Sequence, residues 1–183
     1  MKKLFGIPLF LGILSASIAQ TVPTQSASAP VTITRADLIA SGLTCSMCSN
    51  SIYKALVQLP FVEHVSPDVE HSAFVITFRK QAPVDIDALK QEVSNAGFSV
   101  SSLTLTMSVH DLAIQSDAHV ELGGQMFHFM HVRSQTLNGE TTVRVIDKDF
   151  LSSREYRQYA AYTTMPCYKT GKMGSTRIYH VTI

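Results

Sequence analysis

Two cysteines separated by two residues are the clearest chemical feature of this sequence. Cys45 and Cys48 lie in the segment Gly42-Leu43-Thr44-Cys45-Ser46-Met47-Cys48. A step of three residues lets both sulfur atoms approach one ion, and thiolates prefer soft ions such as copper(I) and zinc over hard cations. Two sulfur ligands suit a nearly linear copper(I) ion better than zinc(II), which takes four ligands. The pair therefore predicts a copper(I) site, with zinc(II) or another soft metal as the alternative.

The cysteine pair is predicted to lie where a strand ends and a helix begins. Residues 33–40 are β-prone, and the residues after the loop are apolar at helical spacing from Ile52 onwards. Backbone N–H groups and the positive end of a helix favour the thiolate, which is the form that binds metal. Cys48 precedes Ile52 by one turn and should lean towards the core, so Cys45 would be the ligand that a partner meets first.

Residues 31–107 are predicted to follow the order strand, helix, strand, strand, helix, strand. Alternating apolar residues predict two strands on either side of a hairpin turn at Glu70-His71-Ser72. Asp85 can cap the second helix, and Gly97 follows it at a position that favours a left-handed residue. The apolar alternation shifts after Val100, which indicates a bulge. Two helices on one face of a four-stranded antiparallel sheet give a ferredoxin-like βαββαβ sandwich of the α+β class.

The loop and this element order resemble the heavy-metal-associated domain of copper chaperones and of copper-ATPase amino-terminal modules. The resemblance covers residues 31–107 and includes Asn95-Ala96-Gly97-Phe98 after the second helix. It implies that Cys45 and Cys48 are the metal ligands and that Phe98 shields the metal. It also implies buffering or delivery of the metal, with a copper-transporting or copper-accepting protein as the partner. Leu43 stands where the family usually has methionine.

Two other interpretations of the cysteine pair stay open. In an oxidising compartment, Cys45 and Cys48 could form a disulfide that binds nothing. They could also serve a thiol–disulfide oxidoreductase, in which Cys45 attacks and Cys48 resolves. The predicted element order differs from that of thioredoxin-like enzymes, and Ser49 in place of histidine excludes a covalently bound haem. Because the sequence contains no recognisable catalytic constellation, it predicts a binding protein and not an enzyme.

Residues 108–183 are predicted to form a second, β-rich domain of unknown role. Gly123-Gly124 is a two-residue hairpin turn between strands at 118–122 and 125–132. A capping box that begins at Ser152 predicts a short helix, and residues 177–183 predict a final strand. The order of these elements resembles a small OB-like barrel.

Ligands that copper(I) prefers are concentrated in this second half. Met126, His128 and Met130 alternate on one face of a predicted strand, and Cys167 lies in a predicted loop before the final strand. These four residues are candidates for an accessory metal site. The alternative is that these side chains belong to the core, where methionine fills space. Phenylalanines on the opposite face of the strand would leave an apolar patch if they were exposed, so at least one face of the strand must be buried.

The first residues predict an export signal. Lys2 and Lys3 supply positive charge, residues 4–14 are apolar, and small residues favour cleavage after residue 19. Residues 20–30 are rich in Ser, Thr, Pro and Ala and predict a flexible leader. Because the apolar run is shorter than the roughly 20 residues of a spanning helix, we expect a periplasmic or secreted protein with no membrane span in the mature chain.

Charge and cysteine content exclude several classes of function. Without Lys2 and Lys3, the remaining 13 Lys and Arg residues face 14 acidic residues, a net charge of −1. With this net charge, the protein lacks the excess of positive charge that is typical of nucleic-acid-binding proteins. Three cysteines are too few for a disulfide-dense scaffold.

Overall fold

The computed structural model describes residues 31–43 and 46–183. The predicted signal peptide and leader, together with Thr44 and Cys45, therefore lie outside the described residues. Within the described part of the chain, no helix combines the length and the apolar character that crossing a membrane requires.

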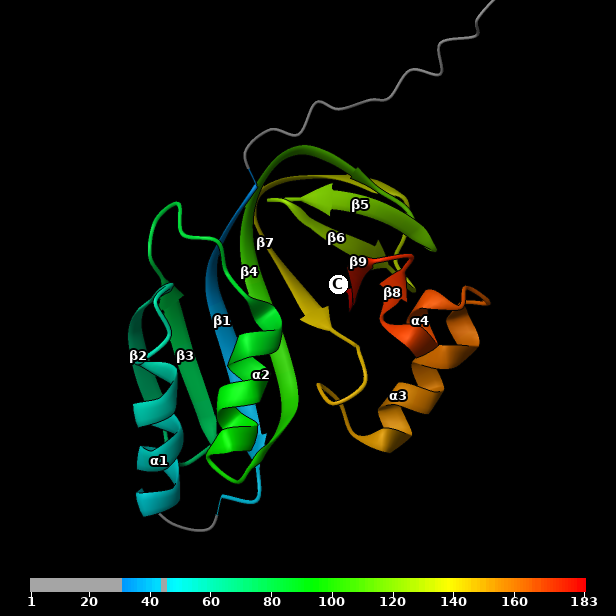
Figure 1. The fold of residues 1–183 in the computed structure, drawn as a ribbon. Coiled ribbons are helices and arrows are strands. Elements are labelled where there is room, and N and C mark those ends of the chain that lie inside the picture. Colours follow the sequence, from blue (N-terminus) through cyan, green and yellow to red (C-terminus); the bar gives the residue numbers. More distant parts are fainter. Residues whose placement is uncertain (1–30, 44–45) are drawn as a thin grey trace, which may run out of the picture.

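The first half has the predicted βαββαβ order. Its elements are β1 (Thr32–Ser41), α1 (Ser46–Leu56), β2 (Val62–Asp68), β3 (Ala73–Phe78), α2 (Ile86–Asn95) and β4 (Ser99–Ile114). The strands are antiparallel neighbours in the order β2-β3-β1-β4. Figure 1 shows α1 and α2 side by side on one face of these strands. The prediction of a ferredoxin-like α+β sandwich is confirmed.

The helices and strands form because their apolar residues recur on one side. In β1 the side chains of Ala36, Leu38 and Ala40 alternate into the core, as a strand that faces the core on one side requires. Fully buried residues one helical turn apart hold each helix to the sheet, at Ile52 and Leu56 in α1 and at Ile86, Leu89 and Val93 in α2.

The predicted cap and bulge are both present. The Asp85 carboxylate accepts a hydrogen bond from the Ala88 N–H at 3.0 Å, and Gly97 has a φ of +90° after the helix. The pairing of β1 with β4 skips one residue between Val100 and Ser102, so Ser101 is the extra residue of a bulge.

Strand β4 continues through residues 107 and 108, where the sequence predicts a domain boundary. Its second part pairs with β7 (Gln135–Val145) from Thr104↔Arg144 to Ile114↔Gln135. The two predicted domains therefore share strand β4. The division of the chain into two domains at residues 107 and 108 stays a prediction.

The second half is rich in strands, as predicted. It contains β5 (Ala118–Leu122), β6 (Gln125–Phe129), β7, α3 (Ser153–Tyr159), the 3-10 turn η1 (Ala160–Tyr162), α4 (Cys167–Thr170), β8 (Lys172–Met173) and β9 (Thr176–Thr182). Within the described residues, the sheet has nine strands in the order β2-β3-β1-β4-β7-β9-β6-β5, with β8 beside β9. Among the described strands, this path ends at β5 and does not return to β4, so the strands curve over one end of the molecule without closing the expected OB-like barrel.

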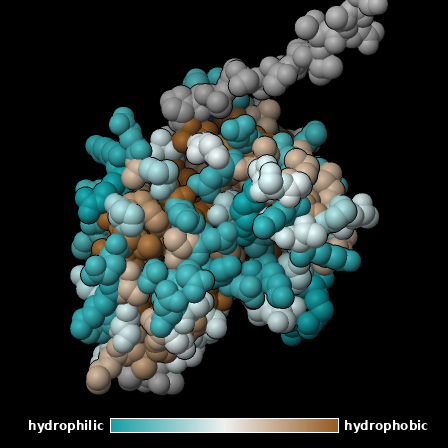
Figure 2. Space-filling view, viewed as in Figure 1, coloured by the Kyte–Doolittle hydropathy of each residue, from teal (hydrophilic) through white to brown (hydrophobic). Residues whose placement is uncertain are grey.

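One apolar core runs through both halves. It joins residues under α1 and α2 to Phe127, Phe129, Phe150 and Val181 of the second half. A smaller cluster of Met130, Ile146, Leu151 and Tyr168 packs beneath α3. On the face shown in Figure 2, polar residues cover most of the surface and apolar residues show mainly between them. The packing fixes the second half against the first.

Candidate metal centre

The loop that carries the cysteine pair leaves β1 through a glycine. Gly42 has a φ of +85°, a left-handed conformation that a side chain disfavours. The next residue, Leu43, is half-buried and packs against the core. The backbone thus turns at Gly42, Leu43 packs against the core, and α1 begins at Ser46.

Cys48 lies in the first turn of α1, on the border between solvent and core. Its side chain is half-buried, while Met47 is 79% exposed and Ile52, one turn further on, is fully buried. The first turn of α1 contains no acidic residue, so no carboxylate offsets the positive end of the helix there. Backbone N–H groups and the positive end of the helix dipole in general favour a negatively charged group at such a position. Cys45, the second predicted ligand, lies outside the described residues.

Phe98 reaches the base of this loop from the far end of α2. Its Cδ1 atom lies 3.8 Å from the point where a Cβ on Gly42 would stand. The ring is half-buried and packs against the core. The structure therefore brings the predicted shielding residue next to the glycine from which the loop starts.

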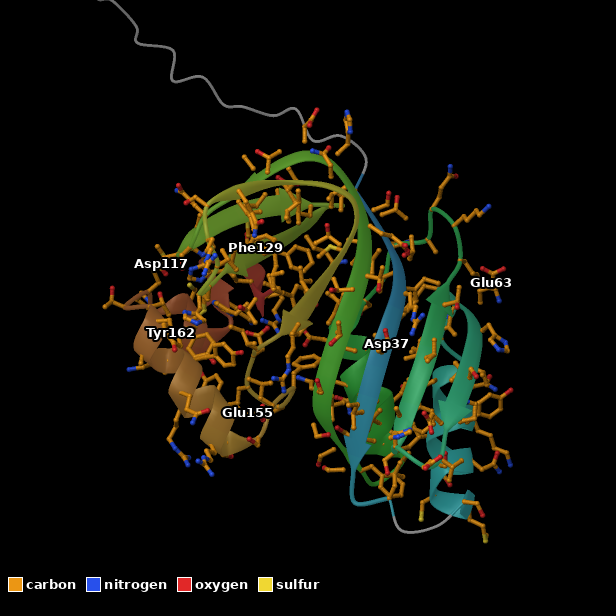
Figure 3. All side chains as sticks on the ribbon, turned by 180° about the vertical axis from the view of Figure 1, so that it is seen from behind. Asp37, Glu63, Asp117, Phe129, Glu155 and Tyr162 are labelled. Carbon is orange, nitrogen blue, oxygen red and sulfur yellow. The ribbon has the colours of Figure 1, made fainter. Side chains whose placement is uncertain are left out.

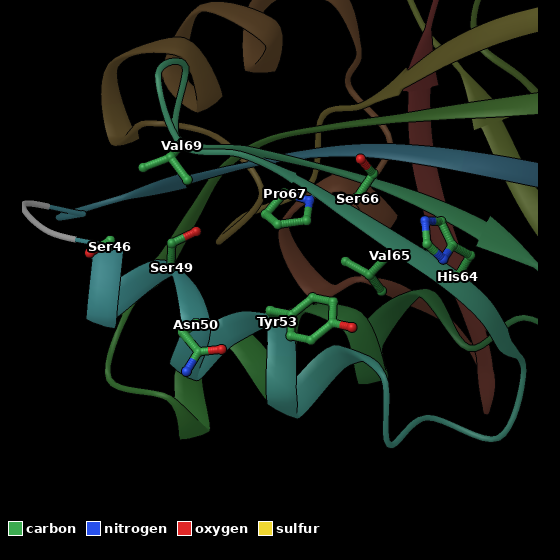
Figure 4. Close-up of a pocket in the computed structure, with 9 residues that line it drawn as sticks. All are labelled: Ser46, Ser49, Asn50, Tyr53, His64, Val65, Ser66, Pro67 and Val69. Carbon is green, nitrogen blue, oxygen red and sulfur yellow. The ribbon is translucent and has the colours of Figure 1, made fainter.

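A pocket of about 430 Å³ opens beside α1, between this helix and β2. Figure 4 shows Ser46, Ser49, Asn50 and Tyr53 on the helix side, opposite residues 64–67 and Val69. Among the described lining residues, Ser46 comes from the segment between the two cysteines, whereas Cys48 does not line the pocket.

Of the four accessory candidates, the structure brings together His128 and Cys167. The Cys167 Sγ atom lies 3.6 Å from His128 Nδ1, and both side chains are buried. Cys167 belongs to the short helix α4, where the sequence suggested a loop. Met130 packs in the apolar cluster beneath α3, and Met126 is half-buried at the other end of β6.

His119 completes this cluster, and sequence reasoning missed it. Its Nε2 atom lies 3.5 Å from Cys167 Sγ, and its ring stacks on His128 with centroids 4.4 Å apart. His119 is paired with His128 across the β5–β6 hairpin. Counting back from the Gly123-Gly124 turn would have revealed this pairing from the sequence.

Acidic residues hold two histidines of this region. His128 Nε2 lies 2.9 Å from Asp117 Oδ1, and His180 Nδ1 lies 2.6 Å from Asp147 Oδ1. Burial, with the neighbouring His180 and His119, lowers the pKa of His128 to about 4 despite the Asp117 contact. Burial also lowers the pKa of His119 and raises the pKa of the Cys167 thiol. At neutral pH the two imidazoles are therefore uncharged, with one nitrogen lone pair each.

Comparisons with known proteins place the first half in a wider context. The heavy-metal-associated domain family matches residues 37–99. No curated protein matches the chain. Oxidised MerP from Ralstonia metallidurans CH34 is 27% identical, with 38% of this chain and 96% of that chain covered and a TM-score of 0.35. The yeast copper transporter domain Ccc2a is 25% identical, with 37% and 90% covered and a TM-score of 0.33. Apo-CopP from Helicobacter pylori is 27% identical, with 36% and 97% covered and a TM-score of 0.32.

Proposed function

We propose that this chain, in which residues 37–99 form a heavy-metal-associated domain, binds copper(I) through Cys45 and Cys48 and buffers or delivers it. The observation that carries the proposal is the position of the cysteine pair. Both cysteines fall within the matched residues, at the junction between β1 and the start of α1. The family match supports heavy-metal binding, and the choice of copper(I) rests on the chemistry of two thiolates.

The surroundings of the loop support capture and transfer of an ion. Helix α1 starts at one end of the molecule in Figure 1, and Met47, in its first turn, presents an apolar side chain that is 79% exposed. An exposed apolar side chain beside a metal loop offers a contact for a copper-transporting or copper-accepting protein. Phe98 covers the base of the loop beside Gly42, while the exposed Met47 would be available to a partner during exchange.

We also propose that the protein acts outside the cytoplasm, after removal of residues 1–19. Support comes from Lys2 and Lys3, followed by the apolar run at residues 4–14. Mass spectrometry of the exported protein should give a chain that begins at Gln20. A chain of full mass in the cytoplasm would contradict this proposal.

Competition with a chromogenic copper(I) chelator tests the metal site. Without air, the reduced protein should withhold one copper(I) from the chelator. Cys45→Ser and Cys48→Ser should each nearly abolish this binding, because a single thiolate cannot form the two-sulfur site. Met47→Leu keeps the size of the exposed side chain and serves as a control that should retain binding. Unchanged affinity in the double serine variant would overturn the proposal.

The rival function is a thiol–disulfide oxidoreductase that uses the same pair. A cysteine in the first turn of a helix suits that chemistry too, and this position is what Cys48 occupies. We propose binding and not catalysis, because the βαββαβ order belongs to the heavy-metal-associated fold. Insulin reduction no faster than that of a small dithiol would support binding. Rapid insulin reduction that Cys45→Ser removes would favour the enzyme.

A further inference from the structure

We propose that His119, His128 and Cys167 form a second metal site, which takes one divalent late transition-metal ion such as zinc(II) or copper(II). These are the residues whose ligand atoms all lie within 4.8 Å of one another in the described part of the chain. Nitrogen and sulfur donors of this kind select late transition metals over magnesium or calcium. The site belongs to the second half of the chain and does not depend on Cys45 and Cys48.

The two sulfur–nitrogen distances match those of a metal coordination sphere. With a metal–sulfur distance of about 2.3 Å and metal–nitrogen distances of about 2.0 Å, a tetrahedral ion separates sulfur from nitrogen by roughly 3.5 Å. The observed separations from Cys167 Sγ are 3.5 Å to His119 Nε2 and 3.6 Å to His128 Nδ1. The two nitrogens lie at most 4.8 Å apart, against roughly 3.3 Å for an ideal site. A small approach of the two rings would complete the geometry.

Three separate elements hold the ligands in place. His119 and His128 are paired on the adjacent strands β5 and β6, and Cys167 is the first residue of α4. The parallel strand β9 places His180 opposite His128 in the same row. Figure 1 shows β5, β6 and α4 on the side of the molecule away from α1, so the second site is remote from the cysteine loop.

A carboxylate fixes which nitrogen of His128 is available. Asp117 accepts a hydrogen bond from Thr163 Oγ1 at 2.6 Å and lies 2.9 Å from His128 Nε2. A carboxylate only accepts, so Nε2 carries the proton and Nδ1 presents its lone pair towards Cys167. Ligand histidines in metal sites usually donate their second N–H in this way. Figure 3 shows Asp117 near Tyr162 at the outer edge of the molecule.

The charges around the cluster favour a divalent ion. Metal binding would release the proton of the Cys167 thiol, and the resulting thiolate and the Asp117 carboxylate would together carry two negative charges. Asp147, the other nearby carboxylate, pairs with Arg177 at 3.1 Å. A divalent cation would balance these two charges, whereas a monovalent cation would leave one negative charge in excess beside the buried Cys167 and His128.

A buried nitrogen beside the cluster also lacks a hydrogen-bond partner. His180 is fully buried, and its Nδ1 donates to Asp147, so its Nε2 presents a lone pair. Within the described residues, no group hydrogen-bonds to this Nε2 atom. The His180 ring lies 5.0 Å from that of His128, centroid to centroid. A metal-bound water is the kind of donor that such an orphaned acceptor needs.

Cobalt(II), a spectroscopic substitute for zinc(II), tests the site in the full chain. The background carries Cys45→Ser and Cys48→Ser, and because the sequence has three cysteines, Cys167 is then the one thiol left. Titration of the reduced protein should give a thiolate-to-cobalt absorption band that saturates at one equivalent. Adding Cys167→Ser or His119→Gln should abolish the band. Adding Asp117→Asn should weaken affinity by about 10- to 100-fold, because it removes the group that orients His128.

His110→Gln is the matched control, because this histidine is exposed and lies on β4, which is not a neighbour of β5 or β6 in the sheet. The cobalt(II) titration of His110→Gln should be unchanged. Circular dichroism is used to check that each variant folds. Zinc(II) and copper(II) should each displace cobalt(II) from the background protein. A folded background protein without the band would show that the three residues are only a hydrogen-bonded core cluster. Binding of copper(I) but of no divalent ion would contradict the charge argument.

Discussion

Two cysteines described by the structure have different surroundings, and the difference governs what each can do. Cys48 is half-buried at the start of a helix, while Cys167 is 5% exposed between two imidazoles. A motif in the sequence identifies the first, because its chemistry depends on neighbours along the chain. The second depends on His119, which lies 48 residues away in the sequence. Only the hairpin register, which the turn at Gly123-Gly124 fixes, links His119 to His128.

Phe98 is expected to control how fast the metal leaves the loop. In Phe98→Ala the ring beside Gly42 is lost, so a chelator should remove copper(I) faster while the protein still binds one ion. Stopped-flow mixing of the loaded protein with excess chelator measures this rate. Phe98→Leu, which keeps most of the apolar bulk, is the matched control and should behave more like the original. Equal transfer rates in all three proteins would show that Phe98 does not shield the site.

At the scale of elements, local sequence signals predicted most of the structure. The Asp85 cap, the Gly97 turn and the bulge at Ser101 all appear. The capping box at Ser152 is also present, with reciprocal hydrogen bonds to Glu155. By contrast, α4 has four residues and no side-chain cap. It is too short to show a helical periodicity, so the sequence did not predict this helix. Helix α4 packs against β8 and β9, the two strands that follow it in the chain.

Helix α1 is expected to depend strongly on Ile52, one of its two fully buried apolar residues, for its packing against the sheet. Ile52 is fully buried, so Ile52→Ala should lower the free energy of unfolding by about 2–5 kcal/mol through lost burial and a cavity. Ser51→Ala, one residue earlier and exposed, should change it by no more than about 0.5 kcal/mol. Urea unfolding measures both. Equal stabilities would mean that α1 is not held through Ile52.

At the scale of the whole molecule, one sheet includes strands from both of the domains that the sequence predicts. The predicted strands and helices of both halves exist, but β4 pairs with β1 along one part and with β7 along the next. Pairings such as β7 with β9, or the parallel pair of β6 with β9, join segments far apart in the chain. Apolar patterns determine which face of a strand is buried and not which strand lies beside it. The way in which the strands of the second half extend the sheet therefore could not be predicted from the sequence.

Arg177 is expected to stabilise the packing of the second half of the chain against α2 of the first. Its Nε donates to Asp87 of α2 at 2.8 Å, and its Nη2 donates to the buried Asp147 at 3.1 Å. Arg177→Ala leaves Asp147 buried without this cation and should cost about 2–4 kcal/mol, somewhat less than a fully buried pair because the arginine is partly exposed. Urea unfolding gives the value, with the exposed Arg157→Ala as the control. A loss as small as that of the control would show that the halves do not rely on Arg177.

The same contact predicts a dependence of stability on pH. Burial favours the neutral form of Asp87, but the Arg177 contact outweighs it and holds the pKa of Asp87 below its ordinary value. The stabilisation is complete above the ordinary pKa of about 4 and is lost as the pH falls through the lowered pKa. Stability measured below about pH 4 should therefore fall less steeply in Arg177→Ala than in the original protein. Parallel slopes would contradict this role of Asp87.

The most direct test of the central claim is X-ray absorption at the copper edge, on reduced protein loaded with one equivalent of copper(I). If Cys45 and Cys48 hold the ion, the first shell should contain sulfur alone, and no outer-shell scattering from imidazole should appear. Cys167→Ser should leave this spectrum unchanged. An imidazole pattern that Cys167→Ser alters would place the copper(I) with His119 and His128, and would contradict the account of the cysteine loop.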